Sequence, residues 1–286
     1  MQNYTHNSGV FLAEDNVRIF YQNWTTSDPV GGVLISHGLG EHSGRYFNLM
    51  EKLDGQGINF YALDHRGHGK SGGIRGHVDF FSNYIQDMKQ YVDSVVKAEN
   101  KQNPLLLLGH SMGGLIALQY ALAYPGDIDY LILSAAALIP ATEVPAHKIY
   151  LGKFLSRFFP RLTLNNELDP RNISTDPEVV KAYMDDSLVH DRVSTRWFTE
   201  YLNSSEDCLN RLPEIELPTL VIHGTGDKMV SIEGSKQIYE KISSRDKEIE
   251  FFPGLLHETM NEKMPEREKV LNFLSDRILK KVNQQD

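Results

Sequence analysis

A serine, an aspartate and a histidine occupy positions in this chain that suit nucleophilic catalysis. Ser111 lies in Gly109–Gly113, which fits Gly-x-Ser-x-Gly between a predicted strand over 104–108 and a predicted helix over 113–124. In that context the serine sits on a strained turn, and its flanking glycines avoid clashes with the neighbouring strand and helix. The positive end of the helix dipole lies where an alkoxide would develop. The motif therefore predicts Ser111 as a nucleophile.

A serine nucleophile needs a base, and the base needs an acid that orients it. Downstream of this strand–turn–serine–helix motif, the chain order is acid and then histidine. Of the 11 histidines, only His257 follows the last predicted strand, and Asp227 comes at the end of the preceding strand. Asp227 could instead cap the helix predicted over 232–242. Asp207 and Asp246 are competing acids, although neither follows a clear strand.

Acyl transfer places negative charge on the former carbonyl oxygen, and two backbone N–H groups usually receive it. Met112, the residue after the nucleophile, is the first predicted donor, and the loop 37–46 after an early strand should supply the second. Leu39 stands between two glycines of that loop and is the predicted second donor. A plain Gly-rich turn is the alternative interpretation of this loop.

Two other patterns resemble cofactor or metal sites. Gly67–Gly72 fits Gly-x-Gly-x-x-Gly and contains Gly-Lys-Ser, but a P-loop would need glycine where the chain has Asp64. No helix opens directly on these glycines, since the next predicted helix starts near Phe80. Five histidines gather in two Gly-rich loops without a His-Glu-x-x-His motif: His37, His42, His65, His68 and His77. The sequence therefore predicts no cofactor and no metal ion.

Strand-length apolar runs alternate with helical patterns, which predicts an α/β fold with a mostly parallel, doubly wound sheet. Leu105–Leu108 is apolar without alternation and suits a strand covered on both faces. Val10–Ala13 and Val17–Trp24 should form a leading antiparallel hairpin. Further strands are expected over 32–36, 58–63, 104–108, 130–134, 219–223 and 248–252, and helices over 46–54, 80–97, 113–124, 232–242 and 262–280.

The stretch between Ser134 and Thr219 has no convincing sheet strand, and prolines punctuate its helical pieces. We interpret it as a helical cap inserted over the sheet, because a structureless loop of that length would be improbable. The predicted organisation is a core of residues 1–138 and 214–286, with the cap at 139–213.

The cap segment 148–159 is amphipathic and basic. A helical projection places Leu151, Phe154, Leu155 and Phe158 on one side, and Lys153, Ser156 and Arg157 on the other. Either this helix packs on its own domain, or it forms an acyl-chain entrance that docks transiently on anionic lipid.

Composition limits the remaining function classes. The 286 residues are 41% hydrophobic and 23% charged, which is ordinary for a globular protein. The net charge of −9 argues against nucleic-acid binding, and the single cysteine, Cys208, excludes an intramolecular disulfide. Since there is neither a secretory signal pattern nor an apolar run long enough to span a membrane, we expect a soluble, cytoplasmic protein.

Five segments carry a resemblance to a known family: His37–Tyr46, Asp64–Ser71, Gly109–Gly114, Leu168–Pro170 and Asp176–Tyr183. Together they resemble the α/β-hydrolases of the monoacylglycerol lipase and lysophospholipase group, over nearly the whole chain. The first segment is specific to this group, whereas the serine motif belongs to the whole superfamily. The resemblance implies the α/β-hydrolase fold with an inserted helical cap.

The resemblance also implies roles for single residues. Ser111, Asp227 and His257 match the catalytic triad. Leu39 and Met112 match the oxyanion donors, although the first position is often alanine in the family. Glu41, Arg45, His110 and Tyr183 match residues around a narrow pocket for a glycerol head group. Met260 is a departure, because mammalian monoacylglycerol lipases have a second histidine three residues beyond the triad histidine.

The expected function is a serine carboxylester hydrolase that cleaves monoacylglycerols to free fatty acid and glycerol through an acyl-enzyme. The alternatives are a lysophospholipase or a general carboxylesterase of the same fold. An acyltransferase is disfavoured because no histidine has aspartate five residues on, and a non-catalytic binding protein is disfavoured by the complete triad. The expected partner is a small lipid ester, with transient membrane-surface contact through the cap. The sequence assigns no oligomeric state.

Overall fold

The computed structural model describes residues 2–101, 103–142 and 144–284. A single large sheet contains the strands β1 (Thr5–Leu12), β2 (Arg18–Thr25), β3 (Gly31–Ser36), β4 (Ile58–Leu63), β5 (Leu105–His110), β6 (Tyr130–Ser134), β9 (Thr219–Gly224) and β10 (Lys247–Phe252). Their order across the sheet is β1-β2-β4-β3-β5-β6-β9-β10. Only the β1–β2 and β2–β4 pairs are antiparallel, which confirms the predicted mostly parallel sheet.

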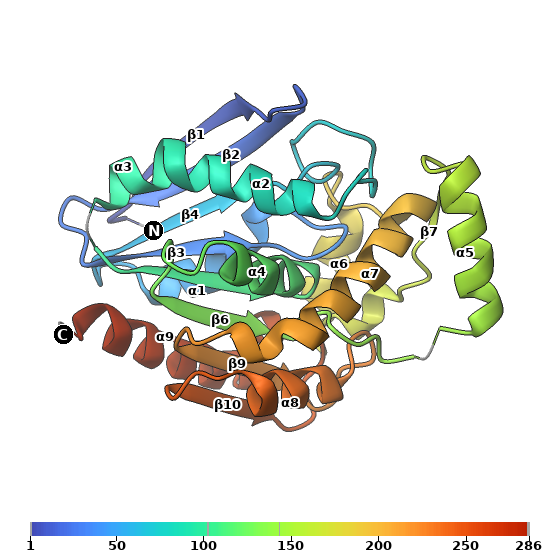
Figure 1. The fold of residues 1–286 in the computed structure, drawn as a ribbon. Coiled ribbons are helices and arrows are strands. Elements are labelled where there is room, and N and C mark those ends of the chain that lie inside the picture. The colour runs from blue at the N-terminus through green and yellow to red at the C-terminus, as the bar shows by residue number, and fades with distance from the viewer. Residues whose placement is uncertain (1, 102, 143, 285–286) are drawn as a thin grey trace.

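Helices cover both faces of this sheet (Figure 1). One face carries α1 (Phe47–Lys52) and α9 (Glu266–Asn283), and the other carries α2 (Ser82–Tyr91), α3 (Lys97–Asn100), α4 (Met112–Ala123) and α8 (Ile232–Lys241). A π-helical turn, Val92–Val96, joins α2 to α3, so the helix predicted over 80–97 is continuous. In β5, Leu105 and Leu107 face one apolar cluster and Leu106 and Leu108 the other. The uninterrupted apolar run therefore marks a strand buried on both faces, as predicted.

The leading hairpin forms as predicted, with Phe11 opposite Ile19 and a positive φ of 65° at Asn16 in the turn. Its first strand begins at Thr5, earlier than the apolar pattern indicates. The added residues are polar and exposed at positions 5–8 and end in a half-buried glycine, so hydrophobic periodicity could not reveal them.

Between β6 and β9 the chain leaves the sheet, and we call residues 139–213 the cap segment. It contains α5 (Ala146–Phe158), β7 (Thr163–Asn165), α6 (Pro177–Asp185), β8 (Arg192–Ser194) and α7 (Thr195–Arg211), with a short 3-10 turn at Pro170–Asn172. A second 3-10 turn, Leu212–Glu214, spans its end. In Figure 1, α5, α6 and β7 lie beyond one end of the sheet, and α7 runs from there back to pack against α4. The division into core and cap stays a prediction, and residues 1, 102, 143 and 285–286, which it includes, lie outside the described residues.

Two features of the cap segment differ from the sequence expectation. β7 and β8 form a separate antiparallel pair, which strands of three residues were too short to reveal. The α5 residue that packs inward is Ser156, which is 4% exposed and bonded to Thr199 of α7 at 2.8 Å. The apolar Phe154 and Phe158 are instead 57% and 58% exposed. Within the described part of the chain, no helix is long and apolar enough to cross a membrane.

Candidate active site

Ser111 lies at the junction between β5 and α4. β5 ends at His110 and α4 begins at Met112, so the serine occupies the single residue of the turn. Its φ of 54° and ψ of −122° are unusual for a residue with a side chain and show a strained backbone. The N-terminus of the 12-residue helix α4 therefore points at the serine, and the helix dipole favours negative charge there.

The two glycines that flank Ser111 are required by close contacts. A Cβ atom on Gly113 would lie 2.0 Å from the backbone oxygen of Ser36, and one on Gly109 would lie 2.5 Å from the oxygen of Gly113. Such distances are far shorter than van der Waals contact. The start of α4 can therefore pack this closely against β3 and β5 only with glycine at both positions.

Asp227 and His257 come together at the ends of β9 and β10. Asp227 follows β9, and its Oδ2 atom lies 2.7 Å from Nδ1 of His257, in the loop after β10. Both side chains are buried, at 1% and 5% exposure. A hydrogen bond to Nδ1 leaves Nε2 of the imidazole as the nitrogen able to accept a proton, which a general base requires.

The charges around this pair adjust its protonation. Burial alone would lower the pKa of His257, but the charge of Asp227 and its hydrogen bond raise that pKa above the ordinary value. Burial would raise the pKa of Asp227, but its histidine donors hold that pKa well below the usual range. Burial and the neighbouring His257 lower the pKa of His110 to about 4. At neutral pH, Asp227 is therefore charged and His110 is neutral.

The two competing acids lie at the surface. Asp207 and Asp246 are more than half exposed and pair with cations of their own. Asp227 does not cap α8, because Ser231 is the capping residue and accepts from the N–H of Glu233. Of the three candidate acids, Asp227 is therefore the one bonded to a histidine of the site.

A cavity of about 510 Å³ lies in front of the serine. Four of the predicted site residues line it, namely Leu39, Ser111, Met112 and His257. Cap residues supply an apolar wall that includes Val193, Trp197, Phe198 and Tyr201. A volume of this size is typical of small-molecule sites. We call it the Ser111 cavity.

The loop between β3 and α1 holds the peptide of Leu39 by hydrogen bonds. The buried carboxylate of Glu41 accepts from the N–H of Gly38 at 2.6 Å. The N–H of His65 donates to Nε2 of His37 at 2.9 Å, so the ring hydrogen of His37 is on Nδ1. That nitrogen donates to the carbonyl of Gly38 at 2.8 Å. The carbonyl belongs to the same peptide group as the N–H of Leu39, so these bonds fix the direction of that N–H.

The predicted head-group residues Glu41, Arg45 and Tyr183 form one cluster. Arg45 donates to Glu41 at 3.0 Å and to both oxygens of Glu258 at 2.5 and 2.8 Å. Its guanidinium carbon lies 4.6 Å from the ring centre of Tyr183. Burial would raise the pKa of Glu41, but Arg45 and His110 lower it to about 2. Two buried carboxylates therefore share one guanidinium in this cluster.

The cluster adjoins the Ser111 cavity through Gly38. A Cβ atom on Gly38 would lie 2.9 Å from Glu41 Oε1 and 3.2 Å from Cβ of Ser111. The fourth predicted head-group residue, His110, has its ring centre 4.7 Å from that of His257. Met260, the residue that departs from the mammalian pattern, is buried in the apolar cluster on the α9 side. The binding roles of these residues stay predictions.

Sequence reasoning missed three buried polar residues beside the triad: His223, Glu258 and Glu262. Glu262 accepts from the N–H of Leu256 at 2.5 Å and from that of Thr175 at 2.8 Å, so it joins the histidine loop to the cap segment. His223 lies four residues before Asp227 and contacts it. These three residues stand near Asp227 or His257 in the sequence, which could have marked them as candidates. No local pattern, however, identifies the residues that they contact.

Three of the five histidines of the Gly-rich loops pack together in the interior. The ring centre of His37 lies 4.4 Å from that of His65 and 5.4 Å from that of His68. Burial lowers the pKa of all three, so they are neutral at neutral pH. Among residues 2–101, 103–142 and 144–284, no group of three or more His, Cys, Asp or Glu side chains could hold a metal ion.

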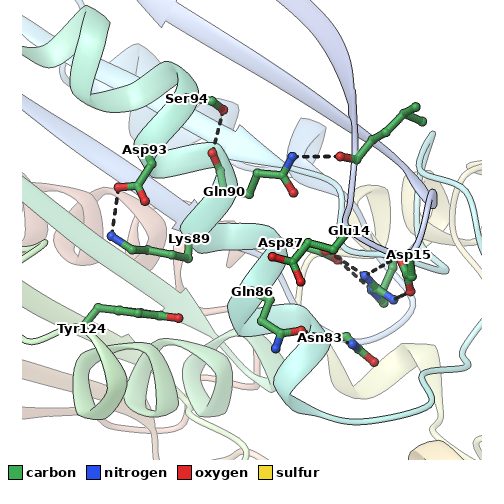
Figure 2. Close-up of a pocket in the computed structure, with 12 residues that line it drawn as sticks. Glu14, Asp15, Asn83, Gln86, Asp87, Lys89, Gln90, Asp93, Ser94 and Tyr124 are labelled. Atoms are coloured by element: carbon green, nitrogen blue, oxygen red, sulfur yellow. Dashed lines mark hydrogen bonds and ion pairs between the residues drawn. The ribbon is translucent and has the colours of Figure 1, made fainter.

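A second hollow, of about 610 Å³, lies against α2 and the turn of the leading hairpin (Figure 2). Its cations are occupied by neighbouring carboxylates. Arg66 donates to Asp15 and Asp87, and Lys89 pairs with Asp93. We therefore assign the candidate active site to the Ser111 cavity.

Comparison with known proteins identifies the family of this chain. The family described as serine aminopeptidase, S33, matches residues 27–264. The chain is 34% identical over 277 residues to the monoacylglycerol lipase of Mycolicibacterium smegmatis, covering 96% of this chain and 98% of the relative. It is 31% identical over 255 residues to the monoglyceride lipase of Homo sapiens, covering 88% and 83%. The solved monoacylglycerol lipase of Paleococcus ferrophilus superposes with a TM-score of 0.82 at 31% identity, covering 97% and 99%.

These matches extend over both parts of the sheet and over the cap segment between them. They confirm the resemblance that the loop and serine motifs indicated. The chain therefore belongs to the serine aminopeptidase S33 family of α/β-hydrolases, and it is a carboxylester hydrolase similar to the monoacylglycerol lipases.

Proposed function

We propose that this chain hydrolyses monoacylglycerols to free fatty acid and glycerol, with Ser111 as the nucleophile. The observation that carries the proposal is that Ser111 and His257 line one cavity, while Asp227 is bonded to the far nitrogen of His257. A serine, a base and an orienting acid are the groups that acyl transfer requires.

In the proposed reaction, Nε2 of His257 takes the hydroxyl proton of Ser111 as the serine oxygen attacks the ester carbonyl. The oxyanion accepts hydrogen bonds from the N–H groups of Leu39 and Met112. His257 then gives its proton to the leaving glycerol oxygen, and an acyl-enzyme remains. Water attacks that ester with His257 again as the base, which releases the fatty acid and restores Ser111.

The lining of the Ser111 cavity supports a single acyl chain as the apolar part of the substrate. Trp197 and Tyr201 stack with ring centres 5.3 Å apart and, with Val193 and Phe198, form an apolar wall. Each methylene that leaves water for such a wall contributes about 0.8 kcal/mol. A triacylglycerol, which has three chains, is a poor fit for one cavity of about 510 Å³.

The charge of the neighbouring cluster supports glycerol as the head group in preference to a phosphate-bearing one. Arg45 is already shared between Glu41 and Glu258. A phosphate there would meet an excess of carboxylate charge, whereas glycerol hydroxyls can donate hydrogen bonds to carboxylate oxygens. Lysophospholipid is therefore the second candidate substrate.

We also propose that α5 brings the cap to an anionic lipid surface. The exposed apolar residues Tyr150, Leu151, Phe154 and Phe158 lie on this helix, as do Lys148, Lys153 and Arg157. Apolar side chains combined with basic ones are typical of helices that bind anionic interfaces. Such contact would bring a membrane-dissolved ester close to the Ser111 cavity.

The test is a substrate panel at matched acyl-chain length and below micelle formation, with monoacylglycerol, lysophosphatidylcholine, diacylglycerol, triacylglycerol and short p-nitrophenyl esters. We expect the highest kcat/KM for monoacylglycerol, increasing with chain length until the cavity is filled. Ser111→Ala should abolish hydrolysis, whereas Ser94→Ala, in the remote hollow, should leave it unchanged. A clear preference for the lysophospholipid would reverse the ranking, and efficient triacylglycerol hydrolysis would contradict the single-chain cavity.

A further inference from the structure

Asp227 contacts a second histidine, His223, besides His257. His223 is the penultimate residue of β9, and its side chain has 0% exposure. Its Nε2 lies 3.0 Å from Asp227 Oδ2, the same oxygen that lies 2.7 Å from Nδ1 of His257. Oδ1 of Asp227 accepts from the backbone N–H groups of Met229 and Val230, at 2.7 and 3.1 Å. A carboxylate has about four acceptor sites, so Asp227 uses all of them.

The partners of His223 determine where its ring carries a proton. Asp227 is charged, and a charged carboxylate only accepts hydrogen bonds. Nε2 of His223 must therefore supply the hydrogen of this contact. The other ring nitrogen, Nδ1, lies 2.7 Å from Oγ of Ser235, a fully buried serine of α8. The ring is thus fixed from both sides, by the acid and by α8.

The acid is fixed through its backbone and through both carboxylate oxygens, since backbone N–H groups hold Oδ1 and the two histidines hold Oδ2. The N–H of Gly226 donates to the carbonyl of Leu255 at 2.9 Å, so the turn that carries Asp227 is fastened to the loop that carries His257. This bond sets the separation of the two segments. It does not set the rotation of the carboxylate, on which His223 acts directly.

We propose that His223 is a positioning residue for the reaction, whose Nε2–H keeps the carboxylate of Asp227 turned toward His257 and shares its charge. The inference rests on the proposed function, because it uses the roles assigned there to Asp227 and His257. A carboxylate that loses one donor interacts more strongly with those that remain. Loss of the His223 hydrogen bond therefore loosens the acid and stabilises the protonated form of His257.

Other titratable groups also face His257 and must be considered in any pH measurement. They are Glu41 of the loop after β3, Glu258 of the same loop as His257, and His110 at the end of β5. The two carboxylates favour a protonated His257, and the neutral His110 does not. These groups remain in place when His223 is changed, so a shifted pH profile reports on the contact with Asp227.

The experiment compares His223→Leu and His223→Gln in the full chain, with pH profiles of p-nitrophenyl ester hydrolysis and thermal unfolding curves. The leucine variant removes the donor, and we expect kcat to fall about 10- to 100-fold, the size typical of losing one hydrogen bond to a charged group. We expect KM to change little and the acid limb of kcat/KM to move to higher pH. Glutamine keeps an N–H donor. His223→Gln should therefore recover most of the wild-type kcat and place the acid limb of kcat/KM at the wild-type pH.

His77→Leu is the matched control. His77 is also buried, and its Nδ1 lies 2.8 Å from Oγ of Ser194, a similar histidine–serine contact away from the triad. We expect this variant to lose thermal stability without any shift of the acid limb. Equal losses in both His223 variants, with an unshifted limb, would show a purely structural role and overturn the proposal. Wild-type kinetics in His223→Leu would overturn it too.

Two measurements separate the remaining cases. If His223→Leu does not fold, ¹⁵N-histidine NMR of the wild-type chain decides, because the proposal requires a protonated Nε2 on His223 across the acid limb. An unprotonated Nε2 would contradict it. A fluorophosphonate probe distinguishes this failure from failure of the proposed function. A wild-type chain that is neither labelled at Ser111 nor active refutes the function, whereas a labelled, active wild type with unaltered His223→Leu refutes only the role of His223.

Discussion

Nδ1 of His257 lies 2.7 Å from Oδ2 of Asp227, although 30 residues separate the two in the chain. Parallel pairing of β9 and β10 explains the approach, because both residues follow the carboxyl ends of neighbouring strands. The same edge of the sheet carries Ser111 at the end of β5. A parallel sheet thus collects on one edge the residues that follow its strands.

Asp227→Asn tests the choice of acid. We expect kcat to fall by about 10⁴-fold with the fold intact, because asparagine can donate to Nδ1 and so favours the wrong imidazole tautomer. Ester hydrolysis and circular dichroism are the measurements. Asp207→Asn is the control and should leave the rate near wild type, since that side chain is 53% exposed. A larger loss in the Asp207 variant would mean that the acid is assigned wrongly.

The pH dependence tests His257 as the base. The raised pKa of His257 means that more of the imidazole is protonated at a given pH than in a free histidine. kcat/KM should therefore rise with pH and level off, with an inflection above the ordinary histidine value of about 6.5. His110, with a pKa of about 4, is neutral over this range and does not contribute. An inflection below the ordinary value, measured with a p-nitrophenyl ester, contradicts the assignment.

Gly113→Ala tests the close packing of the serine turn. The added methyl group would lie 2.0 Å from the backbone oxygen of Ser36, so β3 or α4 must shift. We expect the free energy of unfolding to fall by at least about 1–3 kcal/mol, the usual cost of overpacking, and ester hydrolysis to be lost. Urea denaturation measures the first effect. Gly126→Ala has no atom within 4 Å of the added carbon and should be tolerated.

The lipid-docking proposal for α5 is tested by cosedimentation with vesicles. We expect binding to phosphatidylglycerol vesicles that weakens with added salt, and little binding to phosphatidylcholine alone. Phe154→Ser combined with Phe158→Ser should reduce it, because both side chains are more than half exposed. Phe80→Ser changes a phenylalanine outside the cap that is 62% exposed and should have no effect. Equal vesicle binding by the wild type, the double variant and Phe80→Ser would contradict lipid docking through α5.

Local patterns in the sequence predicted the sheet, and they selected the candidate residues Ser111, Asp227 and His257, of which the structure brings Asp227 and His257 into contact. A buried strand such as β5 reads as an unbroken apolar run, and Ser111 is marked by the glycines that its turn requires. Asp227 and His257 follow from chain order along successive strands. A short or exposed strand, such as β7 or the start of β1, contains too few apolar residues for hydrophobic periodicity to predict it.

Other features depend on contacts that no local pattern contains. Helical projection groups the residues of α5 that share a face, but it cannot say which face turns inward, and the structure turns Ser156 inward. Nothing in the sequence around Glu258 indicates a role for it, because its partner Arg45 lies 213 residues away in the chain. His223 is plain in the sequence, but its contact with Asp227 is seen only in the structure.

The most direct test of the central claim is to trap the acyl-enzyme. Wild-type chain is mixed with a long-chain monoacylglycerol, quenched in acid within the first turnover, and digested for peptide mapping by mass spectrometry. We predict the acyl mass on Ser111 of the wild-type chain and none in Ser111→Ala. An acyl group on another residue, or monoacylglycerol cleavage by Ser111→Ala at the wild-type rate, would contradict it.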